Sequence, residues 1–376
     1  MGKYTLMHKN HHVADVIIND VGIPNIIEII EIHNKDRLPF TAKFPDEDLT
    51  PAILNSWWLK RSIPASRNNI NYVLEKLNIS VPSELINKAF GLSLSEQYWV
   101  NPHENLKDWT KINFFTNPFS EDLGNILIGG KIINENIDFN APENSLDGVL
   151  EKRWKIIDDK RYLIKGGNES FNQEPINEKI ATIICQKLNI NHVAYDIVTI
   201  DGKIFSKCQC FIDENHDFIT ARPIIYTRPF NNAKDYEHMV ECLEQLGITN
   251  PRKSLEHMII LDYLMLNTDR HHGNFGIVRN ANTLSDIKMA PIFDTGTSLW
   301  CKNPNIHYNT TNPSLTFSNY HEEQIKLVKD LGQFDFSILE DVSEQIFKLL
   351  CLLPDSNKER NEDIANGFQM RLDSLM

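Results

Sequence analysis

The sequence has no apolar segment that approaches the roughly 18 residues needed to cross a bilayer. Its first residues also lack the apolar core of a secretory signal. We therefore expect a cytoplasmic protein that makes no contact with a membrane. Cysteine is sparse: the six residues are scattered, with one C-x-C pair and no paired C-x-x-C sets. This pattern excludes a disulfide framework and gives no sign of a zinc site, so we expect reduced thiols.

Positive charge is in short supply. Lys and Arg number 38 against 51 Asp and Glu, which gives a net charge of −13. Because nucleic-acid binding depends on cations that displace counterions from phosphates, we expect no direct binding of DNA or RNA. Glycine and proline follow no period, which excludes collagen-like and low-complexity chains. Hydrophobic residues, at 41%, are enough to bury a globular core.

The first hundred or so residues carry signals of ordinary secondary structure. Strands are predicted at residues 13–18 and 26–32, and helices at 66–79 and 82–94. Ser66 is placed as the N-cap of the first of these helices. This part of the chain contains no motif that indicates a chemistry.

From about residue 126 the pattern becomes richer in strands and then in helices. Strands are predicted at residues 149–157, 161–165, 193–200 and 203–212, and helices at 176–188, 255–266, 322–331, 338–352 and 359–375. Asp201-Gly202 lies between two strand-like runs, and this dipeptide indicates a hairpin because a type I′ turn needs positive φ at both positions.

The order of these elements predicts an α+β protein with two unlike lobes. It excludes a doubly wound sheet and a TIM barrel, which need regular alternation of strands and helices. We place an accessory α/β region at residues 1–125, a strand-rich N-lobe at 126–212 and a mainly helical C-lobe at 213–376.

The most informative segment lies between an apolar helix and an apolar strand, and reads Asn-Thr-Asp-Arg-His-His-Gly-Asn at residues 267–274. Asp269 and Asn274 have the D-x-x-x-x-N spacing of a phosphoryl-transfer loop. In such a loop the Asp accepts the proton of the attacking hydroxyl and the Asn ligates Mg²⁺. Taken alone the segment is equally a polar turn after a helix.

Two further segments match the same chemistry. Asp294 ends an apolar run and is followed by Gly296, as in the loop that supplies the second Mg²⁺ ligand of a kinase. Lys165 ends an apolar strand, where its ammonium would meet the α- and β-phosphates. Glu178, thirteen residues later, lies near the start of a predicted helix and can pair with Lys165.

A fourth segment, Ser145-Leu-Asp-Gly148, comes just before the first strand of the predicted N-lobe. Its single glycine makes it a weak phosphate-loop signal by itself. The order in the chain carries more weight: a loop, a strand Lys, a helix Glu, a hairpin, D-x-x-x-x-N and a second Asp follow one another as in a protein kinase.

These residues resemble the HipA-like serine/threonine kinases of bacterial toxin–antitoxin systems. The segments at 267–274 and 291–296 carry the resemblance, and the order Asp-Arg-His is shared with phosphatidylinositol kinases. The match covers about residues 140–300 well and the helical tail loosely. The resemblance implies a two-lobed protein-kinase-like fold, an ATP substrate, Mg²⁺, and transfer to a protein hydroxyl.

Matching residue by residue, the resemblance implies Asp269 as general base and Asn274 and Asp294 as Mg²⁺ ligands. It implies that Lys165 binds phosphate, that Glu178 pairs with it and that His271 lies near the γ-phosphate. It also implies ATP contacts from Gly148, and from Cys210 and Phe211 at the end of the strand that leads into the adenine-binding hinge. Ser145 is the implied autophosphorylation candidate.

The family also suggests partners. Some members phosphorylate aminoacyl-tRNA synthetases and so halt translation, which makes a translation component a candidate substrate, and a small helix-turn-helix antitoxin is a candidate partner. Two alternatives stay open on the sequence. One is a small-molecule or lipid kinase with the same Asp-Arg-His loop. The other is a nucleotide-binding pseudokinase that acts within a toxin–antitoxin complex.

Overall fold

We analysed a computed structural model of the protein. It describes residues 1–19, 23–43, 48–64, 70–77, 79–128, 137–145, 148–168, 170–229, 232, 234–308 and 313–376. The chain divides into two compact units. The first unit comprises residues 1–163, 212–219 and 278–286, and the second unit comprises residues 164–211, 220–277 and 287–376. The lobe boundaries expected from the sequence were placed by the positions of the kinase-like motifs, and they stay predictions.

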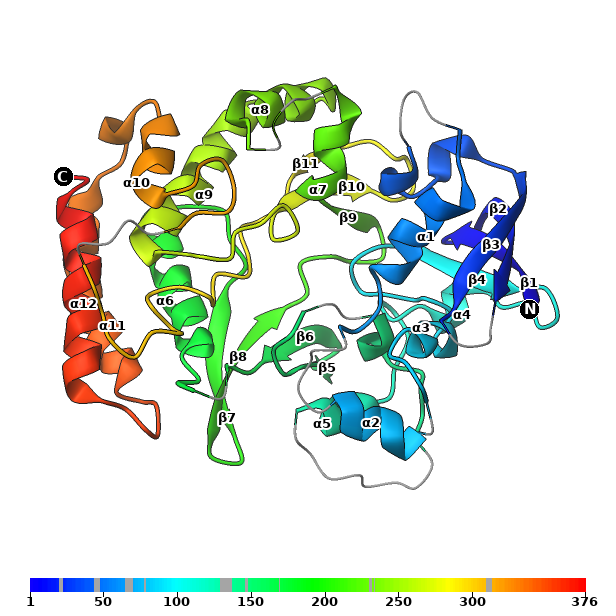
Figure 1. Ribbon diagram of the computed structural model, residues 1–376, viewed down its shortest axis with the longest axis horizontal. Helices are drawn as coiled ribbons and strands as arrows, with labels where there is room; N and C mark the ends of the chain where they lie inside the picture. The colour runs from blue at the N-terminus through cyan, green and yellow to red at the C-terminus, as the bar shows by residue number, and fades with distance from the viewer. Residues whose placement is uncertain are drawn as a thin grey trace. The chain divides into compact units, whose positions relative to one another are not determined.

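The first unit contains a four-stranded antiparallel sheet, drawn in blue and cyan in Figure 1. Its strands are β1 (Gly2–His8), β2 (His11–Asn19), β3 (Asn25–Ile32) and β4 (Tyr98–Pro102), in the order β3-β2-β1-β4. The two strands expected at residues 13–18 and 26–32 are therefore confirmed as β2 and β3. Alternate residues of β2 are buried against helix α1 (Pro51–Leu59), whose Trp57 and Trp58 belong to the same core.

The helix expected at residues 82–94 is wrong in extent, because α3 covers only Glu84–Lys88. Phe90 and Gly91 both have positive φ, which ends the helix. Gly91 also has no room for a side chain, since a Cβ there would lie 2.6 Å from the buried ring of Trp58. The other expected helix of this region is α2 (Ile70–Leu77), and its proposed cap Ser66 lies outside the described residues.

The remaining elements of the first unit are short, namely α4 (Trp109–Ile112), α5 (Asp122–Leu127), a 3₁₀ turn at Pro142–Ser145 and β5 (Lys152–Ile157). The strand β5 and the next one, β6 (Lys160–Lys165), are separated by Asp158 and Asp159, both with positive φ. This hairpin joins two segments that the sequence predicts as strands, at residues 149–157 and 161–165, although β5 begins three residues later than expected. The last two residues of β6, Ile164 and Lys165, belong to the second unit.

In the second unit, β7 (Tyr195–Ile200) and β8 (Lys203–Gln209) form the expected hairpin, and Asp201 and Gly202 both have positive φ as a type I′ turn requires. Helix α6 (Glu174–Lys187) packs on both strands of this hairpin. Three short strands remain among the described residues: β9 at His216–Thr220 and β10 at Gly276–Asn280, which lie mostly in the first unit, and β11 at Lys288–Met289 in the second unit.

The rest of the second unit is mainly helical, as expected. Its helices are α7 (Ala221–Ile224), α8 (Tyr236–Gln245), α9 (Pro251–Met265), α10 (His321–Gln324), α11 (Val342–Leu350) and α12 (Lys358–Asp373). The helix expected at residues 322–331 is wrong in extent, because α10 ends at Gln324 and a 3₁₀ turn at Ile325–Leu327 follows it. The helix α9 is buried along most of its length, and α12 packs against both α9 and α11. In Figure 1, α11 and α12 are the two helices drawn in orange-red and red. The α+β class expected from the sequence is confirmed.

A buried network of charged side chains joins distant segments of the first unit. The imidazole Nε2 of His8 lies 2.9 Å from Oδ2 of Asp217, and Arg279 donates to the same oxygen at 2.8 Å. Arg37 donates to Nδ1 of His8 at 2.9 Å. Since a guanidinium only donates, Nδ1 accepts, and His8 is neutral with its proton on Nε2. The network thereby fastens the segments 212–219 and 278–286 to the amino-terminal sheet.

This network predicts a loss of stability in acid. Burial alone would raise the pKa of Asp217, but hydrogen bonds from His8 and Arg279 and the positive charge of Arg279 outweigh it and lower that pKa to about 2. Because that carboxyl has a higher pKa in the unfolded chain, its contribution is complete above pH 4 and is lost as the pH falls toward 2, by about 2 kcal/mol. We expect Asp217→Asn to flatten this part of the pH dependence, measured as the free energy of urea unfolding.

Asp286→Asn is a suitable control, because Asp286 is exposed in the same unit and Asn tolerates its positive φ. It should reproduce the wild-type pH dependence. Equal slopes for wild type and Asp217→Asn between pH 4 and pH 2 would show that this network does not contribute to acid sensitivity.

Candidate active site

A buried lysine joins two carboxylates in the second unit. Lys165, the last residue of β6, donates from Nζ to Glu178 on α6 and to Oδ1 of Asp294, the latter at 2.5 Å. Lys165 and Glu178 are almost completely buried, whereas 37% of the Asp294 side chain is exposed. The structure therefore brings together three of the residues that the sequence singled out, from segments more than a hundred residues apart.

The two carboxylates keep the lysine charged. Burial by itself would lower the pKa of Lys165, but Asp294 and Glu178 outweigh it and raise the pKa well above its usual value. The ring of Tyr195 lies 5.7 Å from Nζ and adds a cation–π contact. Lys165 is thus a permanently cationic group with one exposed partner, Asp294, and such a group can bind phosphate oxygens.

The loop with Asp269 is shaped by the end of α9. Leu266 caps that helix with a left-handed φ of 50°, and the amide of Asn267 donates to Asp262 at 2.9 Å. The Asn267 side chain accepts in turn from the backbone N–H of Asp269 at 3.0 Å. Asn274 closes the loop, because its Nδ2 donates to the carbonyl of Asp269 at 2.8 Å. Asp269 and Asn274 are therefore held at opposite ends of one compact turn.

His271 lies inside the same turn. Its N–H donates to the carbonyl of Asp269 at 2.8 Å, and its Nδ1 accepts from the N–H of Gly273 at 3.0 Å. A Cβ on Gly273 would lie 2.8 Å from the His271 ring, so a glycine suits this position. These bonds fix the imidazole beside Asp269.

Arg270 ties this loop to the segment that carries Asp294. Its guanidinium is paired with the buried carboxylate of Asp262, with Nε at 3.0 Å from Oδ2. The nitrogen Nη1 donates to two carbonyls, that of Asn274 at 2.6 Å and that of Phe293 at 2.5 Å. Because one nitrogen binds both, Asn274 and the residue before Asp294 lie close to each other. Sequence reasoning gave no role to Arg270 or Asp262.

The segment after Asp294 is fastened to α6. Asn177 donates from Nδ2 to the carbonyls of Gly296 at 2.8 Å and Ser298 at 2.7 Å. A Cβ on Gly296 would lie 3.3 Å from Oε1 of Glu178, so the turn passes close to the lysine partner. Asp294 itself has a φ of 56°. The backbone of Asp294 therefore has a left-handed conformation that few residues other than glycine adopt.

Asp269 is half-buried, and the pKa of its carboxyl group is shifted from the ordinary value. Burial raises its pKa above the ordinary range, and the negative charge of Asp294 adds to this, while His271 acts in the opposite direction. Perturbed carboxyl groups in a polar recess are frequent among catalytic acids and bases. The direction of the shift suits a general base that titrates nearer to neutral pH than an ordinary Asp.

The remaining predicted residues lie outside this cluster or at its margin. Phe211, 36% exposed, follows the end of β8, and its ring stacks on Phe293 with centroids 5.5 Å apart. Cys210 beside it is half-buried. Ser145 and Gly148 belong to the first unit, and the two residues between them lie outside the described residues. Ser145 donates from Oγ to the carbonyl of Leu92 at 2.5 Å.

The donor set fits Mg²⁺. Among the described residues no three His, Cys, Asp or Glu side chains form a metal cage. Mg²⁺ in phosphotransferases is usually held by one or two protein oxygens together with substrate phosphates. The part-exposed carboxylate of Asp294 and the amide of Asn274 supply such oxygens. Since Nδ2 of Asn274 is bonded to Asp269, its Oδ1 is the atom that would face a cation.

The family can now be named from its sequence model. The model of the HipA-like C-terminal domain matches residues 144–351, more than half of the chain. The chain belongs to the HipA-like family. The matched range contains the lysine, both carboxylates and the whole loop of the candidate site. A search of curated protein sequences found no match.

A solved structure shows the same fold at low identity. The chain is similar to HipA of Shewanella oneidensis MR-1, solved in complex with HipB and operator DNA, at 14% identity and a TM-score of 0.56. That likeness covers 99% of this chain and 96% of the other. The chain also resembles the Helicobacter pylori proinflammatory kinase CtkA at 16% identity, with a TM-score of 0.46 over 60% of this chain and 92% of that one. A HipA-like fold thus extends over nearly the whole chain.

The described residues contain no helix long and apolar enough to cross a membrane.

Proposed function

We propose that this HipA-like protein is an ATP- and Mg²⁺-dependent kinase that phosphorylates serine or threonine hydroxyls of proteins, itself included. One observation carries the proposal. Lys165 contacts both Glu178 and Asp294, and Arg270 fastens the loop of Asp269 to the segment that holds Asp294. A phosphate-binding cation, a candidate base and two cation ligands are thereby held in one unit.

Each residue then has a distinct task. Lys165 binds phosphate oxygens of ATP, and Glu178 keeps its ammonium in place. Asn274 and Asp294 would hold Mg²⁺, an ion that supplies positive charge to the phosphates when it is bound. Asp269 accepts the proton of the substrate hydroxyl. The oxygen of that hydroxyl bonds to the γ-phosphorus, and the bond between this phosphorus and the bridging oxygen of the β-phosphate breaks, which releases ADP. Positioning and charge neutralisation supply most of the rate enhancement.

The test is the intact mass of the purified protein before and after incubation with ATP and Mg²⁺. We expect a gain of at least one phosphate that EDTA abolishes, mapped to Ser145 or its neighbours. Ser145 has to leave its bond to the Leu92 carbonyl to be modified. No phosphate on the protein, and none on any protein of a bacterial extract, would contradict the proposal. Transfer to a lipid or a small molecule instead would reassign the substrate.

The family suggests a class of substrate and a kind of partner. We expect a translation component, such as an aminoacyl-tRNA synthetase, to accept phosphate, and a small helix-turn-helix antitoxin to bind the chain. The likeness to a HipA solved with HipB and operator DNA supports the partner, because it spans nearly all of both chains. The chain itself is acidic, so DNA contacts would come from that partner. A gel shift of operator DNA by this chain should therefore require the partner.

A further inference from the structure

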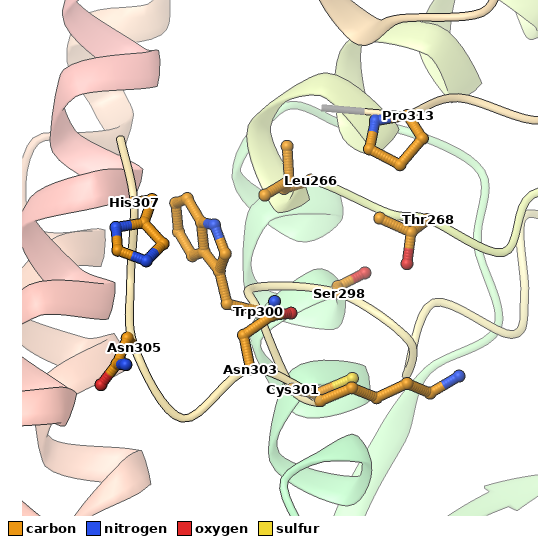
Figure 2. Close-up of a pocket in the computed structure, with 10 residues that line it drawn as sticks. Leu266, Thr268, Ser298, Trp300, Cys301, Asn303, Asn305, His307 and Pro313 are labelled. Atoms are coloured by element: carbon orange, nitrogen blue, oxygen red, sulfur yellow. The ribbon is translucent and has the colours of Figure 1, made fainter. Parts of the chain in front are cut away.

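A cavity of about 310 Å³ opens in the second unit beside the loop of Asp269. Its lining includes Thr268, Trp300, Lys302, Asn303, Asn305 and His307. Figure 2 shows Leu266, Thr268 and Ser298 on one side of the Trp300 ring, and Asn305 and His307 on the other. Its volume is at the lower end of the range for ligand sites, about 300 to 1,000 Å³, which suits an amino-acid side chain.

The cavity shares a wall with the proposed catalytic loop. Thr268 lines it and is the residue directly before Asp269. The N–H of Thr268 donates to the carbonyl of Thr297 at 3.0 Å, and the N–H of Leu299 donates to the carbonyl of Met265 at 2.8 Å. These two bonds join the start of the catalytic loop to the segment that follows Asp294. A group in the cavity would therefore lie next to the position of the substrate hydroxyl.

The outer wall of the cavity is held by α12. Arg360 donates to the carbonyls of Trp300 at 2.9 Å and Asn303 at 3.1 Å. Tyr308 donates to the carbonyl of Asp363 at 2.9 Å, and its ring meets the Trp300 ring edge-on at 6.3 Å. The segment from Trp300 to Tyr308 is thus fixed at both ends, so the cavity is formed before a ligand arrives.

The chemistry of the lining favours a negatively charged occupant. The chain has an excess of acid, with a net charge of −13, yet none of the described residues that line the cavity is an Asp or a Glu. Lys302 brings a positive charge, and Asn303, Asn305 and His307 bring further hydrogen-bond donors. The ammonium of Lys302 also lowers the pKa of Asp269, against the effect of burial, which shows that its charge reaches the proposed base. Leu266 and Trp300 offer apolar surface for a methylene stem.

We propose that this cavity binds a glutamate or aspartate side chain of the protein substrate, in a residue that flanks the phosphorylated serine or threonine. The carboxylate would face Lys302 and the amides, and the stem would lie against Trp300. This inference rests on the proposed function for its meaning, since it assigns the substrate side of the same site. It selects proteins whose acceptor hydroxyl lies close to an acidic residue.

The test measures peptide binding, which needs no phosphate transfer. Fluorescent peptides with a central serine carry one glutamate that is moved through the flanking positions, and each has a twin with glutamine in its place. Anisotropy titrations use the full chain with ADP and Mg²⁺. We expect one flanking position at which the glutamate peptide binds about fivefold more tightly than its twin, the range of a part-exposed ion pair.

Substitutions at Lys302 identify the cavity as the source of this preference. Lys302→Gln should abolish the difference between the twins, and Lys302→Glu should reverse it, so that a lysine peptide binds better than the glutamate peptide. The matched control is Lys253→Glu, which makes the same charge change at an exposed position of α9 outside the cavity. It should leave the preference intact.

The outcomes separate the two proposals. A glutamate preference that depends on Lys302, with no phosphate transfer in any assay, would support the cavity and refute the kinase. Equal binding of the twins at every position would overturn the cavity assignment, as would equal effects of the substitutions at Lys302 and Lys253. A phosphoserine peptide that binds far more tightly than the glutamate peptide would assign the cavity to phosphate and overturn the acidic side chain.

Discussion

Asp269→Asn is expected to lower phosphate transfer by about 10²- to 10⁴-fold, the usual contribution of a general base. The amide that replaces the carboxylate has nearly the same shape but cannot take the hydroxyl proton. ATP binding should stay close to that of the wild type, because the proposed phosphate and cation contacts come from Lys165, Asn274 and Asp294. The measurement is single-turnover transfer from labelled ATP, set beside calorimetric titration with a non-hydrolysable analogue.

Asp294→Asn is the variant to compare with Asp269→Asn, because it should weaken nucleotide binding as well as transfer. It removes a carboxylate that would bind Mg²⁺ and that contacts Lys165 at 2.5 Å. Nucleotide affinity and transfer should therefore fall together, and the affinity should become less dependent on Mg²⁺. If Asp269→Asn weakened nucleotide binding as much as Asp294→Asn did, Asp269 would be a binding group and its role as base would be refuted.

The pH dependence offers an independent readout of the same group. Burial raises the pKa of Asp269, so its carboxyl becomes protonated at a higher pH than an ordinary Asp. A protonated carboxyl cannot accept the substrate proton, and the transfer rate should fall as the pH drops through this raised pKa. The residual rate of Asp269→Asn should lack this acidic limb. A limb that persists in the variant would belong to another group.

Local signals in the sequence predicted much of the second unit. The hairpin at Asp201-Gly202 depends on two residues with positive φ, and the long helix α9 depends on apolar spacing, so neither needs knowledge of distant contacts. The contact of Lys165 with Glu178 was predicted through the order of the motifs in the chain, whereas the contact of Lys165 with Asp294 was not predicted. Motif order carries information about tertiary contacts only where a fold is already known.

The features that sequence reasoning missed depend on distant partners. Strands β1 and β4 were not predicted. The position of β4 depends on its pairing with β1, which joins residues about a hundred positions apart. Arg270 looks like one more polar residue in a polar loop. Arg270 is buried because it pairs with a carboxylate on α9 and with two backbone carbonyls. Every residue has a backbone carbonyl, so the sequence does not show which of them bind an arginine. A charged residue between a proposed base and a proposed cation ligand is the one signal that could have indicated it.

Asp262→Asn is expected to destabilise the protein by about 3 to 5 kcal/mol, as is usual when one partner of a buried ion pair is removed. Arg270 is 1% exposed and would keep its charge with no carboxylate beside it. The matched control is Glu237→Gln, which breaks the surface pair between Glu237 and Arg252 and should cost less than about 1 kcal/mol. Both values come from urea unfolding at neutral pH.

A second variant separates stability from the positioning of the site. Asp262→Leu combined with Arg270→Met replaces the pair by apolar side chains, which is often close to neutral for stability. The bonds from Arg270 to the carbonyls of Asn274 and Phe293 are still lost. The loop that carries Asn274 and the segment that carries Asp294 are then no longer held together by the guanidinium. We expect this variant to recover much of the unfolding free energy but little of the transfer rate, and to require more Mg²⁺ for half-maximal rate. Recovery of both the unfolding free energy and the transfer rate would mean that Arg270 stabilises the fold and does not position the site.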